Sequence, residues 1–315
     1  MVLPEVSIVV PTVNSPTFKE CIDSIIAKTR PDYELIIVCD TPSEQKRELL
    51  NSLSAKVLVN ETRIGSLRAI NQGLAATTGK FILVMNDDVI VKTDDWLSPM
   101  IKVLTKYPEF GIACPRIIYP DVNKEDFFAA VTECSLMTRE VLDKVGMLDE
   151  SEEFSHQGGD GDYYMRCKKS GYTIVGINEV QVFHYVGQTI KTELTKEKLE
   201  APMKTLFKRY GNAIKVDQHR HLVYSLSENK LILKGQMLEL GGGNNPQFHP
   251  NIDIRPGFGV DLVANLEEPL PIEDESYGGV WCQYSLEHIS WRKIKDFLKE
   301  VYRILKPEGK AVFIT

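Results

Sequence analysis

The chain has 315 residues, of which 43% are hydrophobic and 26% charged, and it carries a net charge of −7. These values are typical of a water-soluble globular protein with two domains, and the acidic balance excludes a general nucleic-acid-binding protein. No apolar run reaches the roughly 18–20 residues of a membrane helix, and the first residues lack the basic and apolar segments of a signal peptide. Six scattered cysteines without a C-x-x-C pair indicate neither a disulfide framework nor a zinc site, so we expect a cytoplasmic protein.

The first 90 residues alternate short apolar strands with amphipathic helices. Strands are predicted at residues 6–10, 35–38, 56–59 and 81–85. Helical spacing of apolar residues follows over 18–26 and 67–75. Such alternation predicts an α/β fold with a mostly parallel sheet and helices on both faces.

Beyond residue 96 the pattern loosens, and we predict loops, short strands and one helix near residues 163–169. Residues 190–221 then turn basic and helical, with eight Lys or Arg against four Asp or Glu. A new strand–glycine pattern begins at Met237. We therefore predict a first domain over 1–215, a linker over 216–229 and a second domain over 230–315.

Polar residues follow three of the predicted strands at the point where each strand ends. They are Thr12 and Asn14, then Asp40, then the triplet of Asn86, Asp87 and Asp88. In an open α/β sheet, ligands bind outside the carboxyl ends of the strands. Asp40 is placed to accept a hydrogen bond from a base, and Asp88 to bind a divalent cation beside a diphosphate. The alternative is that these are loop residues, turn residues or helix N-caps.

Four segments of this half, residues 6–14, 34–40, 65–71 and 79–88, resemble the nucleotide-binding half of family 2 glycosyltransferases of the GT-A type. In that family an acidic triplet binds the metal–diphosphate of a nucleotide sugar. The resemblance implies a donor site of Thr12, Asn14, Asp40, Arg68 and Asp87, with Asp88 as a ligand of Mn²⁺ or Mg²⁺. Asn86 replaces the first acid of the triplet, and Cys39 replaces the first of two acids after the second strand.

The family resemblance continues through residues 130–137, 145–150 and 159–166. It implies that Asp160 is the catalytic base, with Gly159 in the place of the usual Glu. Asp162 and Arg166 are spaced i, i+4, so a structural pair on one helix face is the favoured interpretation. The resemblance places His184 near the metal and diphosphate, whereas the alternative is a buried core histidine.

The chemistry of such a site follows from its groups. A metal-bound diphosphate is a good leaving group because the cation neutralises charge as the anomeric bond breaks. A carboxylate takes the proton of the acceptor hydroxyl as that hydroxyl attacks. One base opposite the leaving group implies direct displacement and inversion at the anomeric carbon.

Near the C-terminus, residues 238–246 form a predicted strand and glycine turn, and Asp253 follows on a second short strand. With 260–266, 285–289 and 304–310, they resemble class I S-adenosylmethionine-dependent methyltransferases, which have a Rossmann-like fold. The resemblance implies that Gly241 and Gly243 face the methionine part of S-adenosylmethionine, Asp253 the ribose and Asn265 the adenine. Gly278 stands where the family usually has Asp.

Residues 311–315 read as the fifth strand of that fold, without its usual sixth and seventh strands. Two interpretations stay open: a fragment of a longer protein, or an incomplete module with a structural role. The Glu287–His288 pair, near the substrate side in relatives, also reads as a capping and packing pair.

The sequence thus predicts an inverting, metal-dependent glycosyltransferase with an incomplete methyltransferase-like domain. The expected donor is a UDP- or dTDP-linked sugar, and the expected acceptor is a saccharide or lipid-linked molecule in surface-glycan synthesis. The basic stretch 190–221 predicts either peripheral contact with the inner membrane face or a helix packed back on the catalytic domain. The alternatives are a non-catalytic docking module at the C-terminus, or a nucleotidyltransferase.

Overall fold

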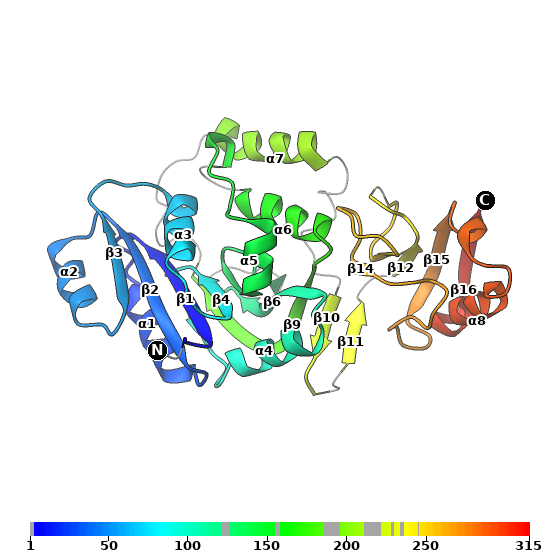
Figure 1. Ribbon diagram of the computed structural model, residues 1–315, viewed down its shortest axis with the longest axis horizontal. Coiled ribbons are helices and arrows are strands. Elements are labelled where there is room, and N and C mark those ends of the chain that lie inside the picture. Colours follow the sequence, from blue (N-terminus) through cyan, green and yellow to red (C-terminus); the bar gives the residue numbers. More distant parts are fainter. Residues whose placement is uncertain are drawn as a thin grey trace.

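The computed structural model describes residues 3–120, 127–154, 158–185, 196–210, 222–227, 230–233, 236–244 and 246–315, which contain two β-sheets (Figure 1). The strands of the larger sheet are β1 Val6–Thr12, β2 Tyr33–Asp40, β3 Lys56–Asn60, β4 Phe81–Met85, β5 Val89–Val91, β6 Phe110–Ile118, β7 Phe127–Phe128, β8 Cys134–Thr138, β9 Thr173–His184, β10 Leu222–Ser225 and β11 Lys230–Leu233. Their order is β11-β10-β9-β6-β8-β4-β1-β2-β3, with β5 beside β9 and β7 beside β6. The predicted α/β class is confirmed.

The first four strands form a parallel block within this sheet. β1 pairs in parallel with β2 and β4, and β2 pairs in parallel with β3, as the alternation of strands and helices predicts. The helices between them are α1 Phe18–Lys28, α2 Glu44–Asn51 and α3 Ser66–Ala75. The short, charged α2 has a weak apolar pattern and was not predicted. Its start is fixed by Ser43, whose side chain accepts a hydrogen bond from the Lys46 backbone.

Beyond residue 96 the helix predicted near residues 163–169 is confirmed, but the prediction of only loops and short strands is wrong, because the chain there also forms two long strands, β6 and β9. β8 runs antiparallel to β4 and β6, whereas β9 runs parallel to β6 over much of its length. The helices of this half are α4 Leu97–Lys106, α5 Arg139–Val145 and α6 Gly159–Lys169, with a short helix η1 Glu152–Phe154. Irregular register between β6 and β9 breaks the period-2 pattern that would have marked them as strands.

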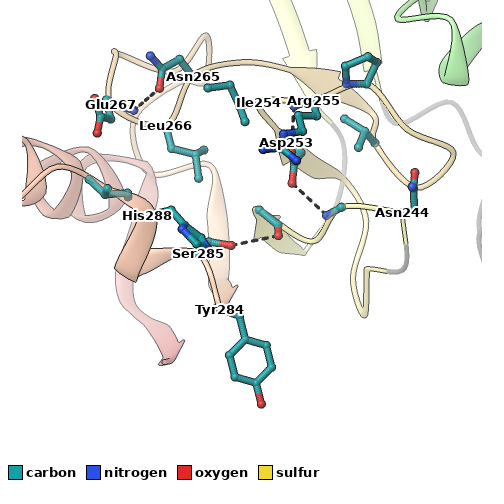
Figure 2. A pocket seen from close by; sticks show the side chains of 15 residues that line it. Asn244, Asp253, Ile254, Arg255, Asn265, Leu266, Glu267, Tyr284, Ser285 and His288 are labelled. Carbon is teal, nitrogen blue, oxygen red and sulfur yellow. Dashed lines mark hydrogen bonds between the residues drawn. The ribbon is translucent and has the colours of Figure 1, made fainter.

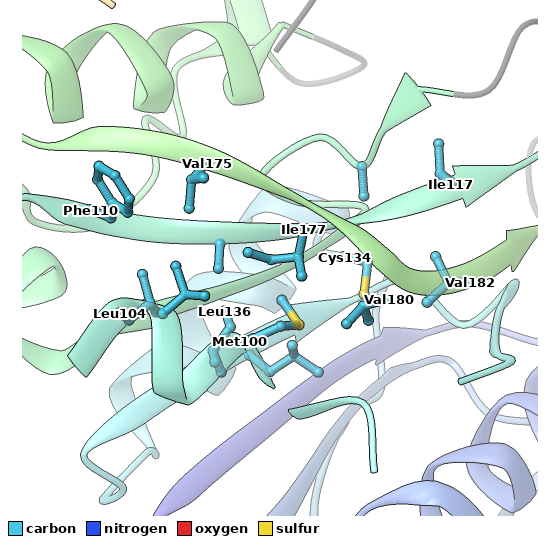
Figure 3. Packing of buried hydrophobic residues seen from close by; sticks show 14 of the residues in the cluster. Met100, Leu104, Phe110, Ile117, Cys134, Leu136, Val175, Ile177, Val180 and Val182 are labelled. Atoms are coloured by element: carbon cyan, nitrogen blue, oxygen red, sulfur yellow. The ribbon is translucent and has the colours of Figure 1, made fainter. Parts of the chain in front are cut away.

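A continuous apolar core joins the sheet to its helices. Figure 3 shows Met100 and Leu104 of α4 against Leu136 of β8 and against Val175 and Ile177 of β9. All five are buried. Each such side chain contributes roughly 1.5–3 kcal/mol to the free energy of unfolding.

The predicted linker, residues 216–229, needs correction. β10 and β11 form an antiparallel hairpin whose first strand extends the larger sheet beside β9. Both strands therefore lie in the first sheet, although they overlap the predicted linker and the start of the predicted second domain. The sequence of the short segments 222–225 and 230–233 does not indicate which strand they join, because the hairpin pairs with the sheet through β9.

Part of the basic stretch forms helix α7, Lys196–Tyr210, and residues 190–195 and 211–221 lie outside the described residues. Leu206 is 2% exposed in the core cluster beside α6, and Phe207 and Tyr210 pack against the same cluster. Lys204 and Lys208 are exposed. The helix therefore packs back on the half of the molecule that contains α6, with these lysines in solvent, as the second of the two predicted alternatives has it. None of the helices in the described ranges has the length and apolar character needed to cross a bilayer.

The smaller sheet lies at the C-terminal end of the molecule in Figure 1. Its strands are β12 Met237–Leu240, β13 Asn251–Asp253, β14 Leu262–Val263, β15 Tyr277–Gln283 and β16 Leu305–Ile314, with η3 Leu286–His288 and α8 Ile294–Ile304 before β16. All pairs are parallel, in the order β14-β13-β12-β15-β16. The strand order reverses between β12 and β15, which is where such sheets bind ligands. The predicted fifth strand is β16, which forms one edge of the sheet.

The two sheets are joined by a buried ion pair. Lys168 in the last turn of α6 places Nζ 3.1 Å from Oδ1 of Asp261, with side chains 3% and 4% exposed. The other oxygen of Asp261 accepts from the Asn251 backbone at 2.7 Å and lies 2.5 Å from Nδ1 of His249. Removing one partner of a buried pair leaves an uncompensated charge, so this contact is costly to break.

We therefore expect Lys168→Met to lower the free energy of unfolding by about 3 kcal/mol, because Asp261 loses its cation. Urea denaturation of the full chain measures this. The matched control is Lys169→Met at the neighbouring exposed position, where we expect a change within about 0.5 kcal/mol. Equal stability of the two variants would contradict the prediction.

Candidate functional site

The parallel strands bring the predicted donor residues to one edge of the larger sheet. Thr12 ends β1 and lies in register with Cys39, one residue before Asp40 at the end of β2. Asp87 follows β4, and its Oδ2 accepts a hydrogen bond from Thr12 Oγ1 at 2.5 Å. Thr12, Asp40 and Asp87 are all buried, with 5%, 2% and 5% of their surface exposed. Residues far apart in sequence thus form a single polar edge.

The Asp40 carboxylate holds the loop that leads into α3. Its Oδ1 accepts from Asn60 Nδ2 at 3.0 Å, and its Oδ2 accepts from the backbone amides of Ile64 and Gly65 at 2.9 and 3.1 Å. This is the turn-like role that the sequence offered as an alternative to base recognition. Contact of Asp40 with a nucleotide base stays a prediction.

Asn14 and Arg68 flank this edge at exposed positions. Asn14 accepts from the backbone amide of Ser43 at 3.1 Å and donates to the carbonyl of Thr41 at 3.2 Å, so it fixes the start of α2. Arg68 in the first turn of α3 lies 3.7 Å from Glu150, with both side chains largely exposed. The Arg68 guanidinium is therefore accessible to an anionic ligand.

Asp88 and His184 meet across the junction of β5 and β9. Oδ1 of Asp88 lies 3.1 Å from Nε2 of His184, and both residues are 7% exposed. Nδ1 of His184 lies 3.7 Å from a carboxylate oxygen of Glu133. The pairing of Val89 with His184 in the antiparallel ladder sets this approach. His184 therefore lies between two carboxylates, and its place beside a metal and a diphosphate stays a prediction.

The donor set fits a divalent cation that also binds phosphate. A carboxylate oxygen of Asp88 and an imidazole nitrogen of His184 converge there, and Mg²⁺ or Mn²⁺ sites commonly combine one or two protein ligands with phosphate oxygens. Within the described ranges no group of three or more His, Cys, Asp or Glu side chains is arranged to hold a metal ion. A cation held by these two residues would thus need the oxygens of a ligand.

Asp160 lies in the first turn of α6 and faces the loop before β8. Oδ1 of Asp160 accepts from the Thr132 backbone amide at 2.8 Å and from the Thr132 hydroxyl. The next residue of that loop, Glu133, is the one near His184, and its carbonyl accepts from the Asn86 backbone at 2.9 Å. One loop therefore connects the predicted base, the acidic triplet and the histidine.

Asp162 is fully buried and forms a structural network, as its spacing from Arg166 predicts. Arg166 Nε donates to its Oδ2 at 2.7 Å, and Arg209 and Tyr210 of α7 donate to its Oδ1 at 2.8 and 2.6 Å. Arg209 also donates to Asp149 at 2.6 Å. Burial and the bond to Asp162 raise the pKa of the Tyr210 hydroxyl. These contacts hold α7 against α6 and the loop at residue 149.

Sequence reasoning missed three polar residues of this region: Thr132, Glu133 and Lys46. Lys46 of α2 is 7% exposed, and its Nζ donates to Thr12 Oγ1 at 3.1 Å. Burial lowers the pKa of the Lys46 ammonium to about 8, although the nearby Asp87 carboxylate acts in the opposite direction. Thr132 and Glu133 lie in the segment 130–137 that carries the family resemblance, but no sequence signal singles them out, and Lys46 lies outside every such segment.

The second candidate site is a cavity of about 720 Å³ at the carboxyl ends of β12 and β13. All four residues predicted for the cofactor line it: Gly241, Gly243, Asp253 and Asn265 (Figure 2). Its volume is that of a typical small-molecule pocket. Helix η3 contributes His288 to the wall, whereas Glu287 and Gly278 do not line it.

The glycine turn and the acid of this cavity fix one another. Asp253 accepts from the backbone amides of Gly243 at 3.1 Å and Arg255 at 2.9 Å. Gly241 has a φ of 77°, and a Cβ built there would lie 2.0 Å from the Ser285 hydroxyl oxygen. Only glycine fits at this position, because a side chain meets both backbone strain and a steric clash. Burial raises the pKa of Glu239, which accepts from the Gln247 and Phe248 amides behind the turn.

Comparison with protein families gives two matches along the chain. Residues 7–151 match the sequence model of Glycosyl transferase family 2. Residues 236–313 match that of the Methyltransferase domain. The chain carries a family 2 glycosyltransferase region and a methyltransferase region. Both resemblances predicted from the sequence are thereby confirmed.

Relatives and solved structures agree with the glycosyltransferase region. Glycosyltransferase GlyG of Streptococcus pneumoniae is 29% identical over 28% of this chain and 31% of its own length. A PGL/p-HBAD biosynthesis glycosyltransferase of Mycobacterium bovis is 29% identical over 30% of this chain and 40% of its own length. An uncharacterised protein of Sinorhizobium fredii is 25% identical over 62% of this chain but only 26% of its own length. The chain thus spans well under half of each of these relatives.

Two solved structures share the fold of this region. TarS 1-349 of S. aureus in complex with UDP-GlcNAc has a TM-score of 0.54 at 16% identity, covering 66% of this chain and 67% of that chain. GalNAc-T7 with UDP, GalNAc and Mn²⁺ has a TM-score of 0.51 at 17% identity, covering 67% of this chain and 50% of that chain. At such identities the likeness shows the fold of the larger sheet and its helices.

Proposed function

We propose that the glycosyltransferase region transfers a sugar from a nucleotide sugar to an acceptor hydroxyl, with inversion and with the help of a divalent cation. The observation that carries the proposal is the loop at Thr132 and Glu133, which connects Asp160 with Asp88 and His184. The proposed base and the two proposed cation ligands are thereby linked through one loop at this edge of the sheet. This arrangement suits attack on one side of an anomeric carbon and departure of a diphosphate on the other.

Each residue has a distinct task in this proposal. Asp160 takes the proton of the attacking hydroxyl, and Thr132 orients its carboxylate through two hydrogen bonds. Asp88 and His184 would hold a divalent cation, which would supply positive charge to offset that of a leaving diphosphate. Thr12, Asn14, Asp40, Arg68 and Asp87 surround the nucleotide as the donor site.

The wider role is part of the same proposal. A UDP- or dTDP-linked sugar is the proposed donor, and a saccharide or lipid-linked molecule of a surface glycan is the proposed acceptor. Similar proteins support this class, since one relative is a PGL/p-HBAD biosynthesis glycosyltransferase and a structural neighbour was solved with UDP-GlcNAc. We propose a cytoplasmic enzyme whose α7 supports the catalytic half. Contact with the inner membrane face would then involve only side chains that α7 leaves in solvent.

For the methyltransferase region we propose binding of S-adenosylmethionine in the 720 Å³ cavity, because the turn glycines, Asp253 and Asn265 converge there. Asp253 has carboxylate oxygens facing the cavity that can accept from ribose hydroxyls. Methylation of the transferred sugar is one role for this region. The alternative is a non-catalytic binding or docking module, which the glycine at position 278 favours.

The base is tested by Asp160→Asn, which keeps the shape of the side chain but cannot accept a proton. We expect kcat for sugar transfer to fall about 10²–10⁴-fold while donor affinity hardly changes. The donor is first identified by testing the wild type against a panel of nucleotide sugars in the presence of Mn²⁺. Asp143→Asn, at an exposed position of α5, is the matched control and should keep full activity. A loss confined to donor binding would reassign Asp160 to the sugar or the metal.

The cation ligand is tested by Asp88→Ala. The side chain lies at a strand end, so we expect an intact fold with loss of the Mn²⁺-dependent part of donor binding and of turnover. Calorimetry of the donor nucleotide with and without Mn²⁺ separates the two contributions. Asp94→Ala, which removes an exposed carboxylate on the same half, should change neither. Wild-type turnover in Asp88→Ala would remove this residue from the site.

The cofactor cavity is tested by titrating S-adenosylmethionine into the full chain and into Gly241→Ala. We expect binding to the wild type and none to the variant, since the added methyl group meets the Ser285 side chain. Gly146→Ala is the control, because Gly146 has a similar φ of 85° but open space around it. It should bind as the wild type does. If the wild-type chain binds no S-adenosylmethionine, this proposal fails, and the non-catalytic docking module is the interpretation that remains.

A further inference from the structure

Lys46 occupies an unusual place for a lysine at the donor edge. It lies in the first turn of α2 with 7% of its surface exposed, and its ammonium stands 3.1 Å above the ring of Phe18. Its Nζ donates a hydrogen bond to the Thr12 hydroxyl oxygen at 3.1 Å. Burying an ammonium is costly, and a methionine would fill the same space without that cost. Filling this space therefore does not explain why the position carries a charge.

The hydrogen bonds of Thr12 show on which group the charge of Lys46 acts. An ammonium only donates, so Lys46 uses a lone pair of the Thr12 oxygen, and the hydroxyl proton must go elsewhere. Its acceptor at 2.5 Å is Asp87 Oδ2, whereas the alternative carbonyl of Val13 lies 3.4 Å away. The two hydrogen bonds therefore have one direction: Lys46 donates to Thr12, and Thr12 donates to Asp87. This chain of hydrogen bonds holds the Asp87 carboxylate in one orientation.

The Asp87 backbone is fixed in the same place. Its carbonyl accepts from the Thr17 hydroxyl at 3.1 Å, just before α1. The end of β1 and the starts of α1 and α2 thus all meet the residue that follows β4. The adjacent carboxylate, Asp88, turns instead to His184. Lys46 therefore offsets the negative charge of one carboxylate of the triplet, that of Asp87. The other carboxylate, that of Asp88, is left to bind a cation.

We propose that Lys46 is the positioning residue of the donor site: it orients Asp87 through Thr12 for the nucleoside part of a nucleoside diphosphate and offsets the negative charge of the edge that this anion must approach. The inference rests on the proposed function, since it assumes a nucleotide at this edge. It assigns Lys46 a role in ligand affinity and none in holding the fold together.

The test is Lys46→Met in the full chain, with EDTA present so that the cation makes no contribution. UDP, dTDP and GDP are titrated by calorimetry, and the tightest ligand of the wild type is used for the variants. We expect its affinity to fall about tenfold or more, as is usual for losing a hydrogen bond to a charged group. The melting temperature should stay at or above that of the wild type. Lys46→Arg, which keeps charge and donors, should recover part of the affinity.

Lys19→Met is the matched control, because Lys19 is exposed on neighbouring α1 and pairs only with Asp23 at the surface. It should bind the nucleotide as the wild type does. Wild-type affinity in Lys46→Met would overturn the inference and leave the proposed function standing. A large fall in melting temperature, shared by Lys46→Met and Lys46→Gln, would overturn it in favour of a purely structural role. If the wild type binds none of the three nucleotides, both proposals fail.

Discussion

The parallel register of β1, β2 and β4 places three carboxylates at one buried edge, and much of the glycosyltransferase region serves to accommodate their charge. Each carboxylate is compensated in a different way. Asp40 receives backbone amides of the loop before α3, Asp87 receives the Thr12 hydroxyl supported by Lys46, and Asp88 faces His184. Buried carboxylates need hydrogen-bond partners, and these contacts supply them at each of the three positions.

Helix α6 connects this edge to the rest of the molecule. Its first turn presents Asp160 to Thr132, its middle is held by the Asp162 network with α7, and its last turn forms the buried pair of Lys168 with Asp261. Because Asp261 lies just beyond the cavity residue Val260, the loop that lines the second pocket is anchored to the helix that carries the proposed base. The two regions therefore share a rigid element, although their ligands would be different.

The methyltransferase region is built around its glycine turn. The described residues between β12 and β13, 241–244 and 246–250, contain no helix, so the turn is held by Asp253, Asn251 and Glu239. The oxygens of these side chains accept hydrogen bonds from the backbone amides of the turn, which therefore do not need a helix as their partner. The wide cavity above the turn results from the same arrangement, and β16 leaves one side of this sheet as an edge.

The sequence by itself determined the four parallel strands and the i, i+4 pair of Asp162 and Arg166, because these depend on periodicity and on spacing within short segments. Its resemblance to two families implied the order of both sets of motifs and four of the residues that line the second cavity. Only the tertiary structure decided the positions of Lys46, Thr132 and Glu133, the pairing of β10 with β9 and of β11 with β10, and the packing of α7. Several of these features depend on contacts between distant segments, from 28 residues apart for Thr132 and Asp160 to 75 residues apart for Thr12 and Asp87. No local pattern encodes such a contact, because it exists only when the sheet brings the two segments together.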